Sequence, residues 1–546
     1  MIIWGSIMEE FSARQLFAVP SFDLEVEEQH IFDKFYHFLD NSGVAEIIKK
    51  AIRNDTKKGG RPNVNFYNLF AAVLYGFSRG RSTVRDLADA CGHDIRFIEI
   101  MQQVRPSYST IANFINSVMV EYEEEVFACI NRQIIKEMSI AISDAFIDGT
   151  KWEANANKYK FVWKPITYHR KISITFFALL KENNLCPTYD IEDMVRSATV
   201  IRVMNVLETE RARFDETQYT NLQKAFGNIL IKVLEYEEKE EICGIERKSY
   251  YKTDHDATAM CLKSDYYTGK GSNLHAAYNV QAVVVKGMVL SYYVSQNRVD
   301  SPDFIPALER FYRMYGKYPE NVCADSGYGT LTNYRFLKQK HIGNYVKSQS
   351  WEGNVSGSYP DQYRINDDET ITCLNGQTGH KVDIPGRHPK KAGSIFYKID
   401  DCATCVFKDY CMRFLKDPNQ QTYKIFEIIP EFALLKQQGE ANLLSVKGIE
   451  IRINRSIQVE GVFGAEKQDY RYVRIRRRGI KKVSTEIMLV FLGLNLKRLF
   501  NYFETGKALE FWKAPDGLQP ESFKRPSAKR LSQKGKRIHN NTYNKN

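Results

Sequence analysis

The stretch Val322-Cys323-Ala324-Asp325-Ser326-Gly327-Tyr328-Gly329 decides the fold of the middle of this chain. Its apolar first half predicts a short buried strand, and the Ser-Gly that follows Asp325 predicts a turn at the end of that strand. Residues 302–315 and 332–340 have helical periodicity, and residues 343–347 form a further strand-like run. Strands that alternate with helices of this length are typical of an α/β sheet.

Three more strand-like runs precede this stretch. Residues Leu274–Val285 and Met288–Ser295 are rich in β-branched and aromatic side chains and are separated by a Lys-Gly pair, a hairpin signal. The first run, residues 145–148, ends at an aspartate before a glycine turn. The resulting order is three strands, helix, strand, helix, strand, which is that of an RNase H-like core, a mixed sheet flanked by helices. In that topology the first and fourth strands are neighbours, so we expect Asp148 and Asp325 to lie side by side.

Three carboxylates are candidate ligands of a catalytic metal centre. Asp148 and Asp325 close strand-like runs, and Glu460 lies in the helix-like stretch Val459-Glu460-Gly461-Val462. When water or a 3′-hydroxyl attacks a phosphodiester, two Mg²⁺ ions about 3.5–4 Å apart neutralise the attacking and leaving oxygens, and carboxylates hold these ions. Either aspartate alone has an ordinary alternative role as the cap of a turn. The pair in this strand order, together with Glu460, favours a site for two Mg²⁺ ions, with Mn²⁺ as a substitute.

Further acids flank the second and third strands of this order. Asp254 and Asp256 come before the second strand, and Asp300 follows the third. They could act as accessory ligands, but aspartate is also a common cap of turns and helices, and we favour the capping role.

A dense basic run follows Glu460 and favours a nucleic-acid partner. Between Lys467 and Lys482 there is one acid, Asp469, and tyrosines are interleaved with the basic residues. At helical spacing the basic side chains would bind phosphates and the tyrosines would stack on unpaired bases, although a solvated basic face is the alternative. The net charge of +11 agrees with a polyanionic partner but does not require one. The candidate DNA contacts of this run are Lys467, Arg471, Arg474, Arg476, Arg477 and Arg478.

Residues 1–125 form the expected N-terminal domain, which is all helical. Apolar residues recur at helical spacing over residues 31–39 and 66–77, and basic turns separate the patterns. Short helices with basic turns fit a helix-turn-helix-like DNA-binding domain, and a plain helical bundle fits equally well. The candidate DNA contacts here are Arg61, Arg79, Arg81 and Arg85.

The large spacing between the three acids predicts two insertions in the catalytic core. The expected units are a first core segment over residues 140–348, a helical insertion inside it at about 188–250, a cysteine-containing insertion over 349–430, a second core segment with the Glu helix over 431–510, and a basic disordered tail over 511–546. Heptad-like apolar positions in the helical insertion predict a coiled-coil arm.

Four cysteines of the second insertion could close a structural zinc site. They are Cys373, Cys402, Cys405 and Cys411, and Cys402 and Cys405 have the spacing of a CxxC pair. A standard zinc ribbon has two such pairs, so unmetallated thiols are a serious alternative.

The remaining composition agrees with a cytoplasmic protein. No apolar run has the length of a transmembrane helix, and the N-terminus lacks the pattern of a signal peptide. Most cysteines lie singly in apolar contexts, as expected for reduced thiols. We therefore expect a cytoplasmic protein that has no membrane partner.

Around its three acids the chain resembles the DDE transposases of bacterial insertion sequences, in the group that has a zinc-ribbon-like cysteine insertion. The segments that carry this resemblance are Gly60-Arg61-Pro62 to Arg85, Asp148-Gly149-Thr150-Lys151, Tyr278-Asn279-Val280-Gln281, Ala324-Asp325-Ser326-Gly327-Tyr328-Gly329 and Glu460-Gly461-Val462-Phe463-Gly464. Lys467 keeps the expected distance from Glu460, Arg455 stands one residue upstream of the usual arginine, and the usual tyrosine is absent.

The resemblance implies that Asp148, Asp325 and Glu460 bind the metals and that Arg455 contacts the end of the DNA. Such an enzyme, as a homodimer on double-stranded DNA, would bind the inverted repeats of its element, expose a 3′-hydroxyl and join it to target DNA. Two alternatives remain at this stage: a related nuclease that cuts without joining, and a DNA-binding regulator whose core is inactive.

Overall fold

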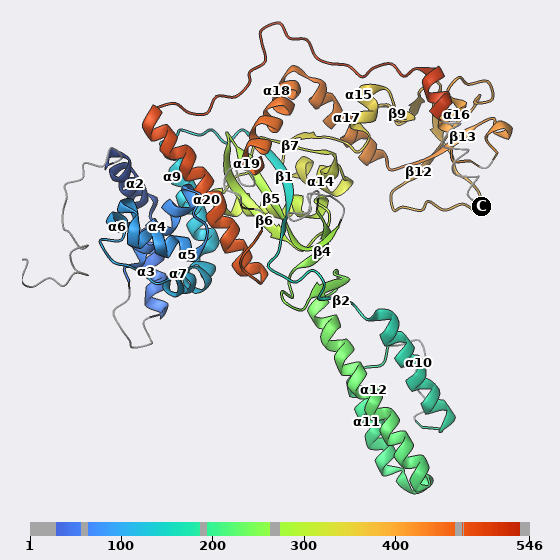
Figure 1. Ribbon diagram of the computed structural model, residues 1–546. Coiled ribbons are helices and arrows are strands. Elements are labelled where there is room, and N and C mark those ends of the chain that lie inside the picture. The colour runs from blue at the N-terminus through green and yellow to red at the C-terminus, as the bar shows by residue number, and fades with distance from the viewer. Residues whose placement is uncertain are drawn as a thin grey trace, which may run out of the picture.

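The computed structural model describes most of the chain (Figure 1), namely residues 29–55, 64–185, 194–262, 273–415, 417–464, 472 and 474–534.

A mixed β-sheet lies at the centre of the molecule. Its strands are β1 (Asp144–Glu153), β4 (Thr258–Cys261), β5 (Leu274–Val285), β6 (Met288–Ser295), β7 (Asn321–Ala324) and β8 (Gly343–Val346). The order is β4-β5-β1-β7-β8, and β6 also pairs with β5. β5 is antiparallel to β1, whereas β7 is parallel to β1 and to β8. The predicted strand order is confirmed, and the sheet is compatible with an RNase H-like core.

β1 is longer than the sequence predicts. The predicted turn at Gly149 is wrong, because Gly149 and Thr150 pair with Gln281 and Val280 of β5, so the ladder continues to Glu153. The glycine instead leaves room for two neighbouring side chains. A Cβ at this position would lie 2.5 Å from Gln281 Nε2 and 2.7 Å from Asp300 Oδ1, so two neighbouring side chains fill the space next to Asp148.

Helices cover the sheet and connect its strands. α13 (Phe304–Tyr315) and α14 (Leu331–Gln339) lie in the connections on either side of β7. After the cysteine-containing insertion come α17 (Pro430–Leu444), α18 (Val446–Arg455), the π-helical turn η6 (Ser456–Glu460), α19 (Gly461–Gly464) and the long α20 (Ile480–Thr505). α17 packs beside β8, and η6 contacts β1.

The N-terminal helices share one hydrophobic core with the sheet. They are α2 (Gln29–Ser42), α3 (Val44–Asp55), α4 (Phe66–Ser78), α5 (Val84–His93), α6 (Ile95–Ile100), α7 (Tyr108–Asn113), η1 (Phe114–Val118), α8 (Met119–Glu121) and α9 (Glu123–Glu137). α20 lies between these helices and the sheet (Figure 1). Its Gly493 allows a close approach to α4, since a Cβ there would lie 2.7 Å from the carbonyl carbon of Phe77. One continuous cluster joins Phe70, Val283 and Phe491, so residues 29–137 do not have a core of their own.

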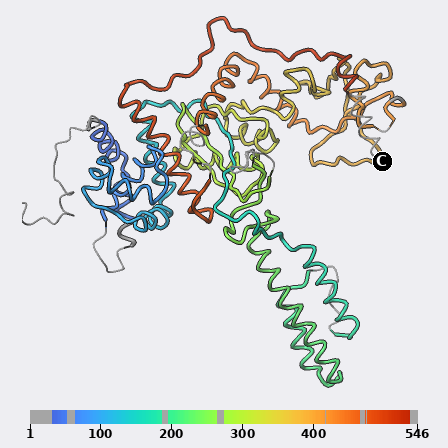
Figure 2. The backbone as a smooth tube through the Cα atoms, viewed as in Figure 1, coloured from blue at the N-terminus to red at the C-terminus, as the bar shows by residue number. Residues whose placement is uncertain are grey.

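A helical arm projects from the sheet (Figures 1 and 2). It contains β2 (Phe161–Trp163), α10 (Ile166–Glu182), α11 (Ser197–Thr209), η2 (Arg211–Arg213), α12 (Glu216–Cys243) and β3 (Ser249–Tyr251). The arm begins before the predicted boundary at residue 188, because α10 packs on α12 and the rings of Phe176 and Phe226 are 5.7 Å apart. The apolar heptad positions Phe226 and Val233 are completely buried in the arm's own small core.

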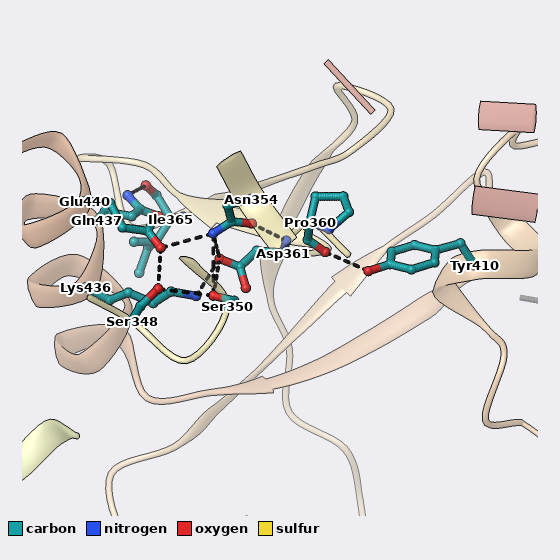
Figure 3. Close-up of polar contacts among 10 residues, drawn as sticks. All are labelled: Ser348, Ser350, Asn354, Pro360, Asp361, Ile365, Tyr410, Lys436, Gln437 and Glu440. Carbon is teal, nitrogen blue, oxygen red and sulfur yellow. Dashed lines mark hydrogen bonds and ion pairs between the residues drawn. The ribbon is translucent and has the colours of Figure 1, made fainter. Parts of the chain in front are cut away.

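The cysteine-containing insertion forms a second sheet. Its elements are α15 (Trp351–Ser356), β9 (Tyr363–Ile365), β10 (Ile371–Cys373), β11 (Thr378–Lys381), β12 (Ile395–Ile399), α16 (Lys408–Cys411), η5 (Pro418–Gln420) and β13 (Lys424–Ile428). The strands are antiparallel, in the order β13-β12-β11-β10-β9. A polar network joins the insertion to the core (Figure 3). In it, buried Glu440 of α17 accepts hydrogen bonds from Ser348 Oγ (2.7 Å) and Asn354 Nδ2 (3.0 Å).

The prediction of a disordered tail is wrong for residues 511–534. The chain after α20 forms no helix or strand over residues 506–527, crosses the molecule to the cysteine-containing insertion (Figure 2), and is helical over residues 528–534. Leu531 is completely buried against Phe407 and Tyr410, and the ring of Phe523 lies 5.7 Å from that of Trp351. These apolar anchors order a segment whose charge alone suggests disorder; residues 535–546 lie outside the described part.

None of the helices in the described part of the chain combines the length and the apolar character needed to span a bilayer.

Candidate active site

Asp148 and Asp325 lie next to each other on neighbouring parallel strands. In the register of β1 and β7, Phe146 pairs with Cys323 and Ile147 with Ala324. Each aspartate is the next residue along its own strand direction. Short apolar runs bury both strands, and the polar site begins where these runs end.

The charges around Asp148 favour a cation at this position. Burial raises the pKa of the Asp148 carboxyl, and the nearby negative charges of Asp325 and Asp300 raise it further. Arg455 opposes them, because its Nη2 lies 3.3 Å from Asp148 Oδ1 and favours the ionised form. The Asp148 side chain retains 27% of its accessible surface, so a ligand can reach it. Carboxylates that repel one another are stabilised by a shared metal ion.

Asp300 belongs to this site, and its predicted role as a cap is wrong. It stands at the start of the turn η3 (Ser301–Asp303), but its side chain makes no capping hydrogen bond. Instead Asp300 Oδ1 accepts hydrogen bonds from Asn279 Nδ2 (2.8 Å) and Gln281 Nε2 (3.1 Å) of β5. Asn279 and Gln281 are two residues apart and therefore project from the same face of the sheet. Asn279 and Gln281, two polar residues in a mainly apolar strand, are the sequence signal that points to this arrangement.

A buried tyrosine extends this network to the loop of Asp325. Tyr328 ends the turn η4 (Ser326–Tyr328), in which Asp325 Oδ1 accepts a hydrogen bond from the backbone N–H of Gly327 (2.9 Å). The Tyr328 hydroxyl donates to Gln281 Oε1. Burial raises the pKa of Tyr328 well above its ordinary value, and the charges of Asp300, Asp148 and Asp325 add to this effect, so the phenol stays a neutral donor. Asp300, Gln281 and Tyr328 thus tie the Asp325 loop to the central strands.

Glu460 is near this site in the fold, but its carboxylate does not reach the aspartates. η6 is anchored because Gln458 Oε1 accepts a hydrogen bond from the backbone N–H of Gly287 (2.8 Å) and Val459 is buried. Glu460 itself is exposed. Among the described residues no group of three or more His, Cys, Asp or Glu side chains is arranged so that it could hold a metal ion. The structure therefore brings together two of the three predicted ligands.

Asp254 and Asp256 hold the start of α20, as the preferred capping role predicts. Asp254 Oδ1 accepts from the backbone N–H of Gly479 (3.1 Å), and Asp256 Oδ2 accepts from that of Ile480 (2.8 Å). Carboxylates are favourable at this end of a helix because its first N–H groups are unpaired within the helix.

The basic run is extended where the structure describes it, so the predicted helical spacing is wrong. The segment around Arg474 lies beside the end of β1, and the backbone N–H of Ile475 donates to the carbonyl of Glu153 (2.9 Å). Arg476 and Arg478 are exposed and donate to Ser82 Oγ (2.8 Å) and to the carbonyl of Asn155 (2.9 Å). Lys467 and Arg471 lie outside the described residues.

The side chains of two residues in the basic run are buried in the protein. The Arg477 side chain is 9% exposed, lies 3.4 Å from the buried Glu486 carboxylate and donates to Asn116 Oδ1 (2.9 Å). Tyr472 is 1% exposed. Neither side chain can contact DNA in this conformation, and the predictions that they do so are wrong because charge and aromatic content do not reveal which way a side chain points.

Among the candidate DNA contacts of the N-terminal helices, one arginine is paired with acids and two are exposed. Arg81 forms ion pairs with Asp86 (2.7 Å) and Asp94 (3.7 Å). Arg79 and Arg85 are exposed, and their guanidinium groups lie over the rings of Tyr75 and Tyr108. Arg61 lies outside the described residues.

The four predicted zinc ligands meet in the second sheet. Cys373, Cys402, Cys405 and Cys411 line one cavity of about 20 Å³. Burial raises the pKa of the Cys411 thiol to about 12 and raises that of Cys402, so these thiols are protonated without a cation. Four thiols are the donor set of a structural zinc site in type and number. The four cysteines therefore fit zinc in the type and number of donors. Within the described residues, however, their sulfur atoms are not arranged to ligate an ion.

Comparison with known protein families points to the transposases. The family described as Transposase DDE domain matches residues 372–500, which include Glu460 and the four cysteines, and the family described as Transposase domain (DUF772) matches residues 20–117. No curated protein and no solved structure matches the chain significantly. The two family matches indicate a DDE transposase of an insertion sequence.

Proposed function

We propose that this transposase binds the terminal inverted repeats of its element and catalyses Mg²⁺-dependent strand cleavage and strand transfer. The observation that carries the proposal is the position of Asp148 next to Asp325 on neighbouring parallel strands, with the pKa of Asp148 raised by burial and by its acidic neighbours. Asp148 within β1 and Asp325 directly after β7 are rigidly placed ligands for hard cations.

Asp148 and Asp325 would hold the ions, and Glu460 would complete the ligand set. Bound there, Mg²⁺ or Mn²⁺ neutralises charge on the attacking and leaving oxygens of the phosphodiester. The network of Asp300, Gln281 and Tyr328 keeps the two aspartates in place. Glu460 is on an exposed turn anchored at Gln458 and Val459, and its carboxylate would have to move toward the aspartates to join the ligand set.

The DNA surface would be formed by exposed arginines. Arg79 and Arg85 on the N-terminal helices and Arg476 and Arg478 beside β1 keep their guanidinium groups on the surface. Phosphate contacts of this kind position DNA without reading its sequence. We propose the same role for Arg61, Arg455, Lys467, Arg471 and Arg474, and we propose that a homodimer forms on DNA.

Asp148→Asn is the test, and the chain offers a matched control. Asp144 lies on the same strand with the same 27% exposure and is also next to a cation, Lys447 (3.7 Å). With a pre-cleaved 3′-hydroxyl end, Mg²⁺ and a plasmid target, we expect Asp148→Asn to abolish joining and to retain DNA binding, and Asp144→Asn to keep both. Cleavage without any joining product in the wild type would identify a nuclease, and full activity of Asp148→Asn would refute the metal assignment.

A further inference from the structure

A stretch without any acidic residue joins the catalytic strand to the arm. Between Glu153, the last residue of β1, and Glu182, the last residue of α10, there are six basic residues and no Asp or Glu. The basic residues are Lys158, Lys160, Lys164, Arg170, Lys171 and Lys181. The first part of this stretch forms β2 and the start of α10, at the junction of the sheet and the arm (Figure 1).

Large aromatic side chains are exposed along the same stretch. Tyr159 is 80% exposed, Tyr168 is 66% exposed, Trp163 is 52% exposed and Phe161 is 44% exposed. Phe161 and Trp163 are two residues apart on β2, so both project from one face of the strand, and their ring centroids are 5.7 Å apart. Exposed apolar side chains that cluster in this way mark a surface that binds something.

The pairing of β2 with β3 adds further cations to this surface. Lys248 and Lys252 flank β3 and are exposed. They are held beside β2, because the N–H of Lys164 donates to the carbonyl of Lys248 and the N–H of Lys252 donates to the carbonyl of Lys160, both at 2.9 Å. We use the name neck surface for Tyr159, Phe161, Trp163 and Tyr168 together with the lysines and arginine of residues 158–171, Lys248 and Lys252.

The neck surface continues toward the candidate active site through two arginines. The carbonyl of Arg476 accepts from Asn155 Nδ2 (2.6 Å), and Arg478 Nε donates to the carbonyl of Asn155 (2.9 Å). Asn155 is two residues beyond the end of β1, the strand that carries Asp148. A chain of cations therefore leads from β1 to the exposed rings of β2.

We propose that the neck surface binds DNA with unpaired bases, which stack on Tyr159, Phe161 and Trp163 while the flanking cations bind phosphates. The inference rests on the proposed function in taking DNA as the partner. Aromatic rings interleaved with Lys and Arg are the combination that holds single strands, because every base has a face that can stack and every nucleotide carries a charge. A contact with a second copy of the chain is disfavoured, because lysine is depleted from the centres of protein interfaces.

The double variant Phe161→Ala/Trp163→Ala of the full chain tests this proposal. The probes are a labelled 20-nucleotide single-stranded oligothymidylate and a labelled 20-base-pair duplex, and the readout is fluorescence anisotropy. We expect the affinity for the single strand to fall by roughly 5- to 150-fold for each stacked base that is lost, and that for the duplex to change by no more than about twofold. The matched control is Ile231→Ala, whose 67% exposed side chain lies on α12 and is not part of the neck surface.

Three outcomes decide the proposal. Unchanged affinity for the single strand overturns it, as does a shift from dimer to monomer in sedimentation with DNA affinity retained, because the rings then serve contacts between copies. If the double variant unfolds at a lower temperature, Tyr159→Ala, which removes the most exposed ring, must still lose at least about fivefold in single-strand affinity. Asp148→Asn should bind the single strand normally, so a failure of the proposed catalytic centre is distinguishable from a failure of the neck surface.

Discussion

Arg455, the last residue of α18, forms an ion pair with Asp148 in which Nη2 and Oδ1 are 3.3 Å apart. The guanidinium group is 16% exposed and stands where the charges of Asp148, Asp325 and Asp300 converge. The positive charge of Arg455 neutralises part of the negative charge that a divalent cation would neutralise. A metal ion at the proposed site would therefore compete with Arg455 for the same carboxylate.

Arg455→Gln should bind Mn²⁺ more tightly than the wild type in the absence of DNA. Removing a competing charge next to a partly exposed carboxylate is worth roughly 1 kcal/mol, or about a fivefold gain in affinity. Isothermal titration with Mn²⁺ measures it. Arg452→Gln is the control, because Arg452 is on the same helix but pairs with Glu521 (2.6 Å). Weaker Mn²⁺ binding by Arg455→Gln would show that Arg455 does not compete with the ion.

Tyr328→Phe should slow strand transfer while leaving DNA binding intact. The change removes the donor to Gln281 Oε1 and frees the loop that carries Asp325. A displaced ligand of this kind costs roughly tenfold to a hundredfold in rate, and the buried unpaired oxygen costs about 1–3 kcal/mol of stability. Rates of joining with a pre-cleaved end and thermal unfolding measure the two effects.

Tyr334→Phe is the control for this change. Tyr334 is equally buried, and its hydroxyl donates over 3.4 Å to the carbonyl of Val346, away from Gln281. It should join DNA within about twofold of the wild-type rate. Equal loss of rate in both variants would mean that any buried tyrosine hydroxyl matters and that the network has no special part in catalysis.

The strands and their order could be predicted from the sequence, whereas the network around the aspartates could not. Apolar runs such as residues Leu274–Val285 are local signals, and few topologies connect such strands, so the meeting of Asp148 and Asp325 follows. The role of Asp300 depends on Gln281, which reaches it only once β5 pairs with β1. Pairings between distant segments are not encoded in local periodicity.

The partners of the basic residues could not be predicted from the sequence either, because they are distant along the chain. Charge groups Arg477 with its neighbours, but its partner is Glu486, a buried acid on α20 that local charge counting does not connect with it. The lysines and arginines of the tail predict disorder, whereas the single side chain of Leu531 anchors its described end. Burial of a leucine contributes about 1.5–3 kcal/mol, and counting charges does not reveal which apolar side chains will be buried.

Cys405→Ser should lower the zinc content of the purified protein. We propose one structural zinc ion per chain, held by the four thiols that line the cavity of the second sheet. Metal analysis after growth with zinc measures the content, and chelation should lower the unfolding temperature of the wild type only. Cys261→Ser, at an exposed cysteine elsewhere, is the control. The zinc site is excluded if wild type and Cys405→Ser contain the same amount of zinc.

Asp303→Asn should reduce the loss of stability with rising pH in the acid range. Burial raises the pKa of Asp303 to about 6, and the charge of Asp300 adds to this, while hydrogen bonds from Ser295 and Asn297 oppose it. Because this folded-state pKa is above the unfolded value of about 3.9, the folded state binds the proton more tightly. Stability should therefore fall as the pH rises from about 4 to about 6, by at most roughly 3 kcal/mol.

The variant Ser295→Ala tests the same carboxyl by raising the pKa of Asp303 instead of removing its charge. The Ser295 hydroxyl donates to Asp303 Oδ2 and lowers the pKa of that carboxyl, so its removal should raise the pKa and extend the fall in stability to higher pH. Urea unfolding of the wild type and both variants between pH 4 and pH 8 measures these slopes. If Asp303→Asn keeps the slope of the wild type, another buried acid must carry the pH dependence, and Glu440, whose pKa burial also raises, would be the next to replace.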